Sequence, residues 1–313
     1  MKLIFMGTPD FAVPCLDILI KDGHEIPLVV TQPDRQRGRG HKVTFSPVKE
    51  KALENNIEVF QPESLKNGEM DDKLRIINPD VIVVVAYGKM LPESVLNYPK
   101  FGCVNVHGSL LPKLRGAAPV QRAVMNGDKI SGITTMKLNS GMDTGDMLLK
   151  FPVEISEDDT AGTLFEKLKI VGATAISKTL TKLERGDIKP VPQNDADATY
   201  APMITKEEAN INWGEDAETL INKIRGLNPA PVAYTYYKGK KVKIYEAVIG
   251  EDTDDTDYGK VWGYFEEKGL GIVGNGKIIY INEFHMENSK RMAVSEYMRG
   301  HSIEPGDYFT DKI

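Results

Sequence analysis

Residues 80–86 read Asp-Val-Ile-Val-Val-Val-Ala, in which five β-branched residues follow one another without a polar interruption. A continuous apolar run of this length is typical of a strand that is buried on both faces, as in a parallel sheet covered by helices. Similar short runs occur at residues 2–6, 25–31 and 102–106, with amphipathic stretches between them. The alternation predicts an α/β domain built on a parallel sheet.

Two helices are predicted around these strands, over residues 11–21 and 160–184. Thr8 is expected to cap the first helix, and Pro9 suits its first turn. The same turn, Gly7-Thr-Pro-Asp10, lacks the Gly-x-Gly-x-x-Gly pattern that lets a pyrophosphate approach a helix. A dinucleotide-dependent oxidoreductase on this sheet is therefore disfavoured.

The chain changes character after residue 186. Residues 186–200 contain several Pro, Asp and Asn residues, which indicates an interdomain linker. A helix is predicted at 217–225, and short alternating runs follow at residues 232–237, 241–248, 260–265, 271–273 and 277–284. Strands at this spacing predict a small closed or half-closed β-barrel. A length of 313 residues also favours two domains, which we place at 1–189 and 208–313 with a linker over 190–207.

Composition narrows the classes of function. The formal net charge is −6, so any contact with nucleic acid must be local, because indiscriminate binding depends on an excess of Lys and Arg. Cys15 and Cys103 form no Cys-x-x-Cys pair, and the five histidines show no metal-ligand spacing. Neither a secretory segment nor a run of ~18 apolar residues occurs. We expect a cytoplasmic protein that binds no metal and no membrane.

The densest polar segment is Asn105-Val-His-Gly-Ser-Leu-Leu-Pro112, which starts at the end of a predicted buried strand. Ligands bind at the carboxyl ends of such strands, and the two-residue period of a strand puts Asn105 and His107 on one face. Residues 138–147, Leu-Asn-Ser-Gly-Met-Asp-Thr-Gly-Asp-Met, predict a tight loop that presents Asp143 or Asp146.

An amide, an imidazole and a carboxylate together suit acyl transfer. Such a reaction needs a donor that stabilises the developing oxyanion and a group that moves the proton of the attacking amine. Taken singly, each has an ordinary structural interpretation. His107 would be a hydrogen-bonding loop residue, Asn105 a residue that ends a strand, and Asp143 a turn residue. Chemistry is favoured only if the three side chains converge.

Five motifs in chain order resemble the methionyl-tRNA formyltransferase family. They are Gly7-Thr-Pro-Asp-Phe11, Val85-Ala-Tyr-Gly88, Asn105-Val-His-Gly-Ser-Leu-Leu-Pro112, Arg115-Gly-Ala-Ala-Pro-Val-Gln-Arg122 and Gly141-Met-Asp-Thr-Gly-Asp146. The resemblance continues through Tyr200 and, more weakly, through Ile211-Asn-Trp213, residues 225–229 and Lys290-Arg-Met292. It therefore covers nearly the whole chain.

This resemblance implies a Rossmann-like formyltransferase domain followed by an OB-like β-barrel that binds tRNA. The implied reaction is transfer of a formyl group from 10-formyltetrahydrofolate to the α-amino group of initiator methionyl-tRNA, for translation initiation. The implied catalytic residues are Asn105, His107 and Asp143. The implied folate-binding residues are Ala86, Tyr87, Ser109, Leu110, Leu111 and Pro112. We expect the enzyme to be a monomer.

Residues 32–46 show no apolar periodicity and predict a long functional loop. Arg35, Arg37, Arg39 and Lys42 alternate there with flexible residues, so the loop can order itself on phosphates or remain a solvated basic loop. The resemblance favours contact with the tRNA acceptor end. A second cluster, Lys238-Gly-Lys-Lys-Val-Lys243, would either contact phosphates or protect an edge strand from pairing.

Two other functions compete with this interpretation. A formyltransferase acting on a small molecule would use the same Asn, His and Asp residues, but it would dispense with the basic loop and the terminal barrel. An RNA-binding module without catalysis would leave the polar segment at 105–112 unexplained.

Overall fold

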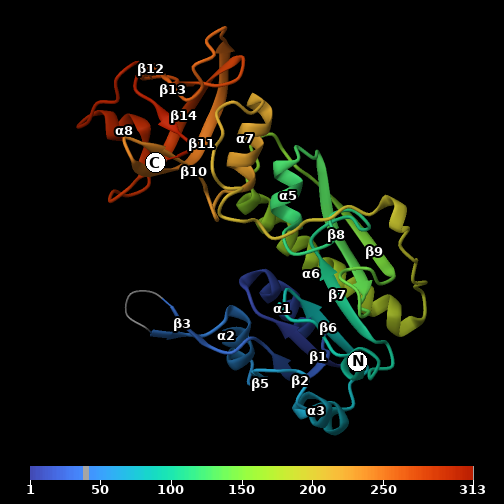
Figure 1. Ribbon diagram of the computed structural model, residues 1–313. Helices are drawn as coiled ribbons and strands as arrows, with labels where there is room; N and C mark the ends of the chain where they lie inside the picture. The colour runs from blue at the N-terminus through green and yellow to red at the C-terminus, as the bar shows by residue number, and fades with distance from the viewer. Residues whose placement is uncertain (38–41, 313) are drawn as a thin grey trace. The chain divides into compact units, whose positions relative to one another are not determined.

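The computed structural model describes residues 1–37 and 42–312, which form two compact units (Figure 1). The first unit comprises Met1–Pro119, Ile130–Glu154 and Phe165–Ala201, and the second comprises Val120–Lys129, Ile155–Leu164 and Pro202–Ile313. The chain thus contributes more than one segment to each unit.

The first unit is built on a seven-stranded sheet in the order β5-β2-β1-β6-β7-β8-β9. Its strands are β1 (Lys2–Gly7), β2 (Glu25–Val30), β5 (Glu58–Phe60), β6 (Val81–Val85), β7 (Cys103–His107), β8 (Ile130–Lys137) and β9 (Met147–Glu154). Its helices are α1 (Val13–Lys21), α2 (Pro47–Glu54), α3 (Glu69–Ile77), α4 (Glu93–Leu96) and most of α6 (Ala161–Arg185). The strands β5, β2, β1, β6 and β7 are parallel to one another, which confirms the predicted α/β fold. Strands β8 and β9 continue the sheet beyond β7 as antiparallel strands.

Helices cover both faces of this sheet (Figure 1). On one face, Ile82 and Val84 of β6 belong to the same buried cluster as Leu74 of α3. On the other face, Val106 of β7 lies against α6 so closely that a Cβ added at Gly172 would be 3.3 Å from its Cγ1. Since neighbouring residues of a strand point to opposite faces, Asn105 and His107 lie on the face away from α6.

The predicted cap of the first helix is wrong. A 3-10 turn, Asp10–Ala12, precedes α1, and no side chain caps either element. The Thr8 hydroxyl instead donates a hydrogen bond to the Tyr87 carbonyl oxygen at 3.3 Å. Thr8 therefore joins the loops that follow two strands and does not start a helix.

The second unit contains a curled antiparallel sheet in the order β12-β13-β14-β11-β10-β16. Its strands are β10 (Ala233–Tyr237), β11 (Lys240–Asp252), β12 (Val261–Phe265), β13 (Gly269–Val273), β14 (Lys277–Met286), β15 (Met292–Ala293) and β16 (Phe309–Thr310). A bridge between Lys260 and Tyr308 joins the two outer edges of the sheet. This closure confirms the predicted β-barrel.

Helices α5 (Pro119–Met125, from Val120 onward), α7 (Ala217–Gly226) and α8 (Val294–Met298) accompany the barrel. The barrel core includes Trp213, Leu220, Ile244, Ile281 and Phe309, each at most 3% exposed. Across the described residues, none of the helices combines the length and the apolar character needed to cross a membrane.

Arg225 ties α7 to the segment that precedes α6 within the second unit. Its Nη1 donates hydrogen bonds to three carbonyl oxygens, those of Ser156 at 3.3 Å, Glu157 at 2.6 Å and Asp159 at 2.9 Å. Its Nη2 donates to Oδ1 of Asn222. One guanidinium thus satisfies four acceptors, which makes Arg225 an anchor of this unit.

Candidate active site

The carboxyl ends of β1, β6 and β7 meet at one edge of the sheet, because these strands are parallel and paired in register. Gly7 lies opposite Val85, and Val84 lies opposite Asn105. The Tyr87 carbonyl oxygen accepts hydrogen bonds from Thr8 and, at 3.0 Å, from Nε2 of Gln32. The loops that follow β1, β2 and β6 are therefore tied together at the edge where ligands bind in such sheets.

His107 is the last residue of β7 and is 6% exposed. Its Nε2 is 3.0 Å from the Leu114 carbonyl oxygen, and its Nδ1 is 3.6 Å from Oδ2 of Asp143. A carbonyl oxygen can only accept, so the contact with Leu114 requires a hydrogen on Nε2. Both ring nitrogens thus face acceptors, and Asp143 forms an ion pair with the ring whenever the ring is protonated.

Asp143 reaches His107 because its loop runs back along β7. The loop starts at Leu138, whose N–H bonds to the carbonyl of Cys103, at the amino end of that strand. It must cover about 13 Å, the length of four strand steps at roughly 3.3 Å each, to reach His107. Asp143 adopts a left-handed conformation, with φ at 53°, and its Oδ2 accepts a hydrogen bond from the Gly116 N–H at 2.9 Å. Of the two aspartates left open by the sequence, Asp143 is the one beside His107.

Asn105 lies two residues before His107 on the same face of β7, and it is half-buried. Within residues 1–37 and 42–312, its amide makes no hydrogen bond to another group of the protein. The structure therefore brings His107 and Asp143 into contact and leaves the Asn105 amide free to donate to a ligand.

The segment Ser109–Pro112 follows β7 as a turn with its own internal bonds. The Ser109 hydroxyl donates to the Lys113 carbonyl at 2.6 Å, and the Leu111 side chain is packed in a small core with Met136 and Met147. Leu110 and Pro112 remain partly exposed. A ligand at this turn would meet those two side chains and the backbone, and not the Leu111 side chain.

Thr134 is a supporting residue that the sequence analysis missed. It is fully buried on β8, opposite His107 in register. Its hydroxyl donates to the Ser109 carbonyl at 2.7 Å and accepts from the Leu111 N–H at 3.0 Å. A threonine in the middle of a strand is ordinary, so no local signal in the sequence distinguishes it.

Tyr87 belongs to the core, whereas the neighbouring Ala86 is exposed. The Tyr87 side chain is 1% exposed, and within the described part of the chain its hydroxyl has no hydrogen-bond partner. Burial raises the pKa of Tyr87 to about 12. The carbonyl of Tyr87, and not its hydroxyl, therefore shapes the edge of the sheet.

We predict that Tyr87→Phe leaves the free energy of unfolding unchanged or raises it by up to about 1 kcal/mol, because a buried hydroxyl without a partner costs free energy. Tyr280→Phe is the matched control, since that buried hydroxyl donates to Glu251 at 2.8 Å. Its removal should cost about 0.5–1.5 kcal/mol. Denaturant unfolding of both variants tests this, and an equal loss in the two would contradict it.

The predicted basic loop contains regular structure. Strands β3 (Arg35–Arg37) and β4 (Lys42–Thr44) pair antiparallel, with Arg37 opposite Lys42, so the predicted loop includes two short strands that were not expected. Short strands of charged and small residues give no apolar alternation by which to recognise them. Arg39 lies outside the described residues.

The base of this two-stranded ribbon is anchored at Asp34. Its carboxylate accepts hydrogen bonds from Nζ of Lys49 and, at 2.9 Å, from Nε2 of Gln61. Gln61 also bonds to the Gln32 carbonyl at 2.9 Å. The Lys49 ammonium holds the pKa of Asp34 below its ordinary value.

A depressed carboxyl pKa contributes stability above the unfolded value, about 3.9, and that stability is lost as the pH falls through the lower folded value. We therefore expect the fall in Tm between about pH 5 and pH 3 to be shallower in Asp34→Asn than in the wild type. Thermal unfolding across this range is the measurement. Parallel curves for the two proteins would show that Asp34 contributes nothing to acid sensitivity.

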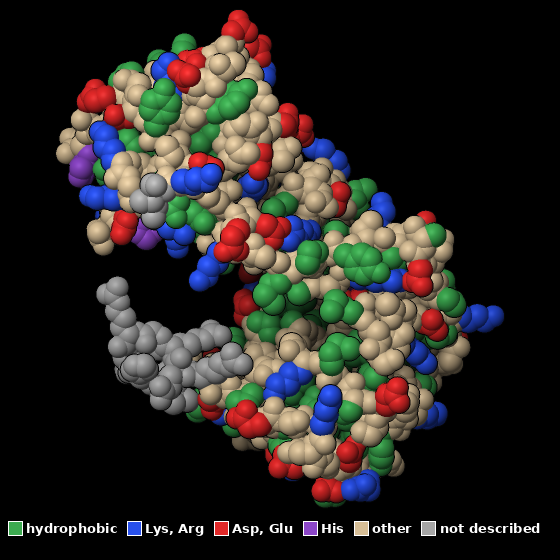
Figure 2. Space-filling model, in the orientation of Figure 1, with side chains coloured by type: hydrophobic (Ala, Val, Ile, Leu, Met, Phe, Trp, Pro, Cys, Tyr) green, Lys and Arg blue, Asp and Glu red, His purple; other side chains and the backbone are tan. Residues whose placement is uncertain are grey.

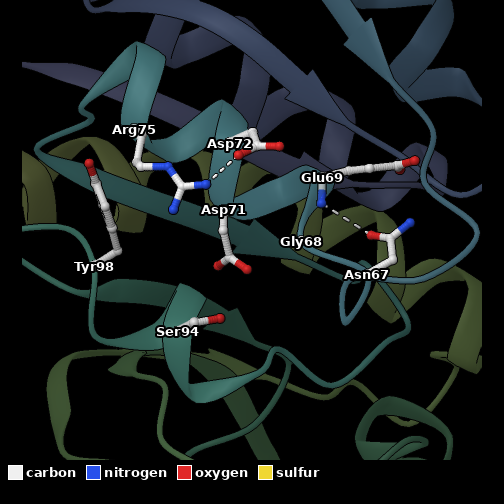
Figure 3. A pocket seen from close by; sticks show the side chains of 8 residues that line it. All are labelled: Asn67, Gly68, Glu69, Asp71, Asp72, Arg75, Ser94 and Tyr98. Atoms are coloured by element: carbon white, nitrogen blue, oxygen red, sulfur yellow. Dashed lines mark hydrogen bonds and ion pairs between the residues drawn. The ribbon is translucent and has the colours of Figure 1, made fainter.

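A separate open hollow of about 400 Å³ lies where α3 begins (Figure 3). Its lining consists of Asn67, Gly68, Glu69, Asp71, Asp72, Arg75, Ser94 and Tyr98. Arg75 pairs with Asp72, so two acidic side chains remain in it. An acidic lining does not suit an anionic ligand, and none of the predicted site residues lies there.

In the described part of the chain, no three His, Cys, Asp or Glu side chains gather as a metal ion would require.

Comparisons with known proteins identify the family to which the chain belongs. Residues 1–180 match the family model described as formyl transferase, and residues 203–302 match the formyl transferase C-terminal domain. The chain is 51% identical over 308 residues to the methionyl-tRNA formyltransferase of Caldanaerobacter subterraneus subsp. tengcongensis, with 98% of this chain and 99% of that protein covered. It is 47% identical over 308 residues to the enzyme of the same name from Acetivibrio thermocellus, with the same coverage.

Solved structures share the fold. The crystal structure of HypX from Aquifex aeolicus in complex with tetrahydrofolic acid matches with a TM-score of 0.63 at 17% identity, covering 99% of this chain and 50% of that chain. The sequence matches extend over both units and nearly the full length of the relatives. The chain therefore belongs to the methionyl-tRNA formyltransferase family.

Proposed function

We propose that the protein transfers the formyl group of 10-formyltetrahydrofolate to the α-amino group of initiator methionyl-tRNA. The observation that carries the proposal is the placement of His107 between the Leu114 carbonyl and the Asp143 carboxylate, near the Asn105 amide, which has no hydrogen-bond partner among the described residues. A buried imidazole with an acidic partner and a free amide donor is a set suited to acyl transfer.

In the proposed reaction the free α-amine attacks the formyl carbon, which is bonded to N10 of the folate. Asn105 donates a hydrogen bond to the oxyanion of the tetrahedral intermediate. His107 donates a second one by sharing the Nε2–H that it directs at the Leu114 carbonyl, and Asp143 orients the ring from the Nδ1 side. The bond from carbon to N10 then breaks, its electron pair returns to N10 and a proton follows. The attacking amine loses a proton and becomes the amide of formylmethionyl-tRNA. No covalent enzyme intermediate is formed.

For the folate, we propose a site formed by Ala86, Tyr87 and the turn Ser109–Pro112. These residues follow β6 and β7, whose carboxyl ends lie side by side. Leu110, Pro112 and Ala86 have exposed surface, and Thr134 holds the turn from beneath. The complex of HypX with tetrahydrofolic acid supports a folate ligand on this fold.

For the tRNA, we propose that Arg35, Arg37, Arg39 and Lys42 contact the acceptor end and that the barrel binds the rest of the molecule weakly. Lys and Arg side chains are interspersed with Asp and Glu over the visible face of the protein (Figure 2), and the net charge is −6. A local basic ribbon is therefore a better source of phosphate contacts than the general charge of the surface.

We further propose that the protein is a monomer and acts in the cytoplasm. Light scattering would test the first point and cell fractionation the second.

A panel of formyl acceptors distinguishes this function from its competitors. With 10-formyltetrahydrofolate as donor, kcat/KM should be at least about 100-fold higher for methionyl-tRNA than for free methionine or a nucleotide-linked amino sugar. A preference for the amino sugar would identify a small-molecule formyltransferase. Binding of tRNA without folate binding would identify an RNA-binding module.

A further inference from the structure

We infer that Gln193 is a positioning residue that holds the Asp143 loop against His107, and that Arg115 in turn holds Gln193. The role in turnover rests on the proposed function, whereas the role in placing Asp143 does not. Both residues lie outside the set that touches the reacting atoms.

The side-chain NH2 group of Gln193 clamps the Asp143 loop. Its Nε2 donates to the Asp143 carbonyl oxygen at 2.7 Å and to the Gly145 carbonyl oxygen at 2.8 Å. Its Oε1 accepts from Nε of Arg115 at 2.9 Å. Since a primary amide has only two N–H donors, both are directed at the loop that carries the catalytic carboxylate.

Elsewhere in the Asp143 loop, Oδ1 of Asn139 accepts from the Gly141 N–H at 3.0 Å and from the Thr144 hydroxyl at 2.9 Å, whereas the carbonyl of Asp143 itself bonds to Gln193. Asp143 adopts the left-handed conformation, and the neighbouring Met142 side chain is 59% exposed, so it adds little packing. A Cβ at Gly145 would overlap the Lys137 carbonyl oxygen, which shows how tight the turn is. A backbone conformation of this kind persists only when neighbouring groups hold it in place.

Arg115 makes the clamp rigid. Its side chain is 2% exposed, and its Nη2 donates to Oδ1 of Asp195 at 2.8 Å. Its backbone bonds to the same segment, with its N–H on the Thr199 carbonyl at 2.9 Å and its carbonyl accepting from the Ala201 N–H at 2.7 Å. Asp195 itself is 85% exposed, so the contacts that fix Arg115 are its two backbone bonds and the bond from Nε to Gln193.

The same arginine lies between the two backbone groups that touch the catalytic pair. The preceding residue, Leu114, presents its carbonyl to His107, and the following residue, Gly116, donates its N–H to Asp143. Segment 193–201 therefore acts on Asp143 from both sides, directly through Gln193 and indirectly through Gly116. A displacement of about 1 Å in such a group can lower a rate by about 10²-fold.

Three variants separate this role from a general structural one. Gln193→Ala removes the clamp. Gln193→Glu keeps an acceptor for Arg115 but cannot donate to the two carbonyl oxygens. Asn194→Ala is the control, because the Asn194 side chain bonds to Ala196 and Asp197 of its own segment and not to the Asp143 loop. Both Gln193 variants should lower kcat by about 10- to 100-fold with the folate KM within twofold of wild type, and the control should not.

A double-mutant cycle then shows whether Gln193 acts through Asp143. In the Asp143→Ala background, Gln193→Ala should change kcat by less than twofold, because the group it positions is gone. Equal losses in both backgrounds, or an unchanged kcat in Gln193→Ala and Gln193→Glu, would overturn the inference.

Hydrogen exchange tests the clamp without any assay of activity. Exchange of the Gly116 amide, which donates to Asp143, should be at least about fivefold faster in Gln193→Ala than in wild type or Asn194→Ala. Unchanged exchange would overturn the inference even if the protein transfers formyl groups. Faster exchange in a protein whose wild type transfers none would preserve the clamp and reject the proposed function.

Discussion

His107→Ala is expected to lower kcat for formyl transfer by about 10²–10⁴-fold, with small changes in the KM for either substrate. The imidazole is buried at the end of β7, between a carbonyl and a carboxylate, where its charge or its N–H acts in surroundings that exclude most water. Alanine removes the donor without opening the fold, since the β7 backbone pairs stay in place. Steady-state kinetics at saturating folate and tRNA measure the loss.

His301→Ala is the control for this experiment, because His301 is exposed and lies in the second unit. Its kcat should remain at the wild-type value. Retention of more than a tenth of wild-type kcat by His107→Ala would remove His107 from the catalytic set. A raised KM with normal kcat would assign it to binding alone.

Arg225→Leu is expected to destabilise the second unit by about 2–4 kcal/mol, because it leaves several carbonyl oxygens without the donor that they share. For a unit of this size each kcal/mol corresponds to about 4 °C in Tm. Arg291→Leu is the matched control. Arg291 makes two hydrogen bonds to Glu283 in the same unit, but its side chain is 47% exposed, so its loss should cost less than about 1 kcal/mol.

Calorimetry of both variants, with the circular dichroism of the folded proteins as a check, measures the difference. If the two arginine variants lose the same Tm, the three carbonyl contacts of Arg225 are not the anchor described here. The transition of the first unit should be unaffected by Arg225→Leu.

Much of the fold could be predicted from local patterns in the sequence. The apolar run at 80–86 corresponds to β6, whose five residues are all buried, and alternation placed the barrel strands within a few residues of their bounds. The two-residue period also placed Asn105 and His107 on one face, away from Val106. These predictions succeed because burial and strand geometry act on neighbouring residues.

Other features depend on contacts between distant segments. The antiparallel pairing of β8 and β9 was not predicted, and neither was the two-stranded ribbon at 35–44. Asp143 was one of two candidates, because only the return of its loop along β7 decides which carboxylate meets His107. Gln193 lies in a stretch rich in Pro and Asp that was predicted to be a linker, yet its contacts are with residues about 50 positions earlier in the chain. No local pattern encodes such a contact.

The most direct test of the central claim is the transfer of labelled formyl from 10-formyltetrahydrofolate to initiator methionyl-tRNA by the purified wild-type protein, followed as label in acid-precipitable tRNA. The account predicts a rate that saturates with both substrates and product in which the label is attached to the methionine amine. A protein that binds the folate but leaves charged initiator tRNA unlabelled would contradict it.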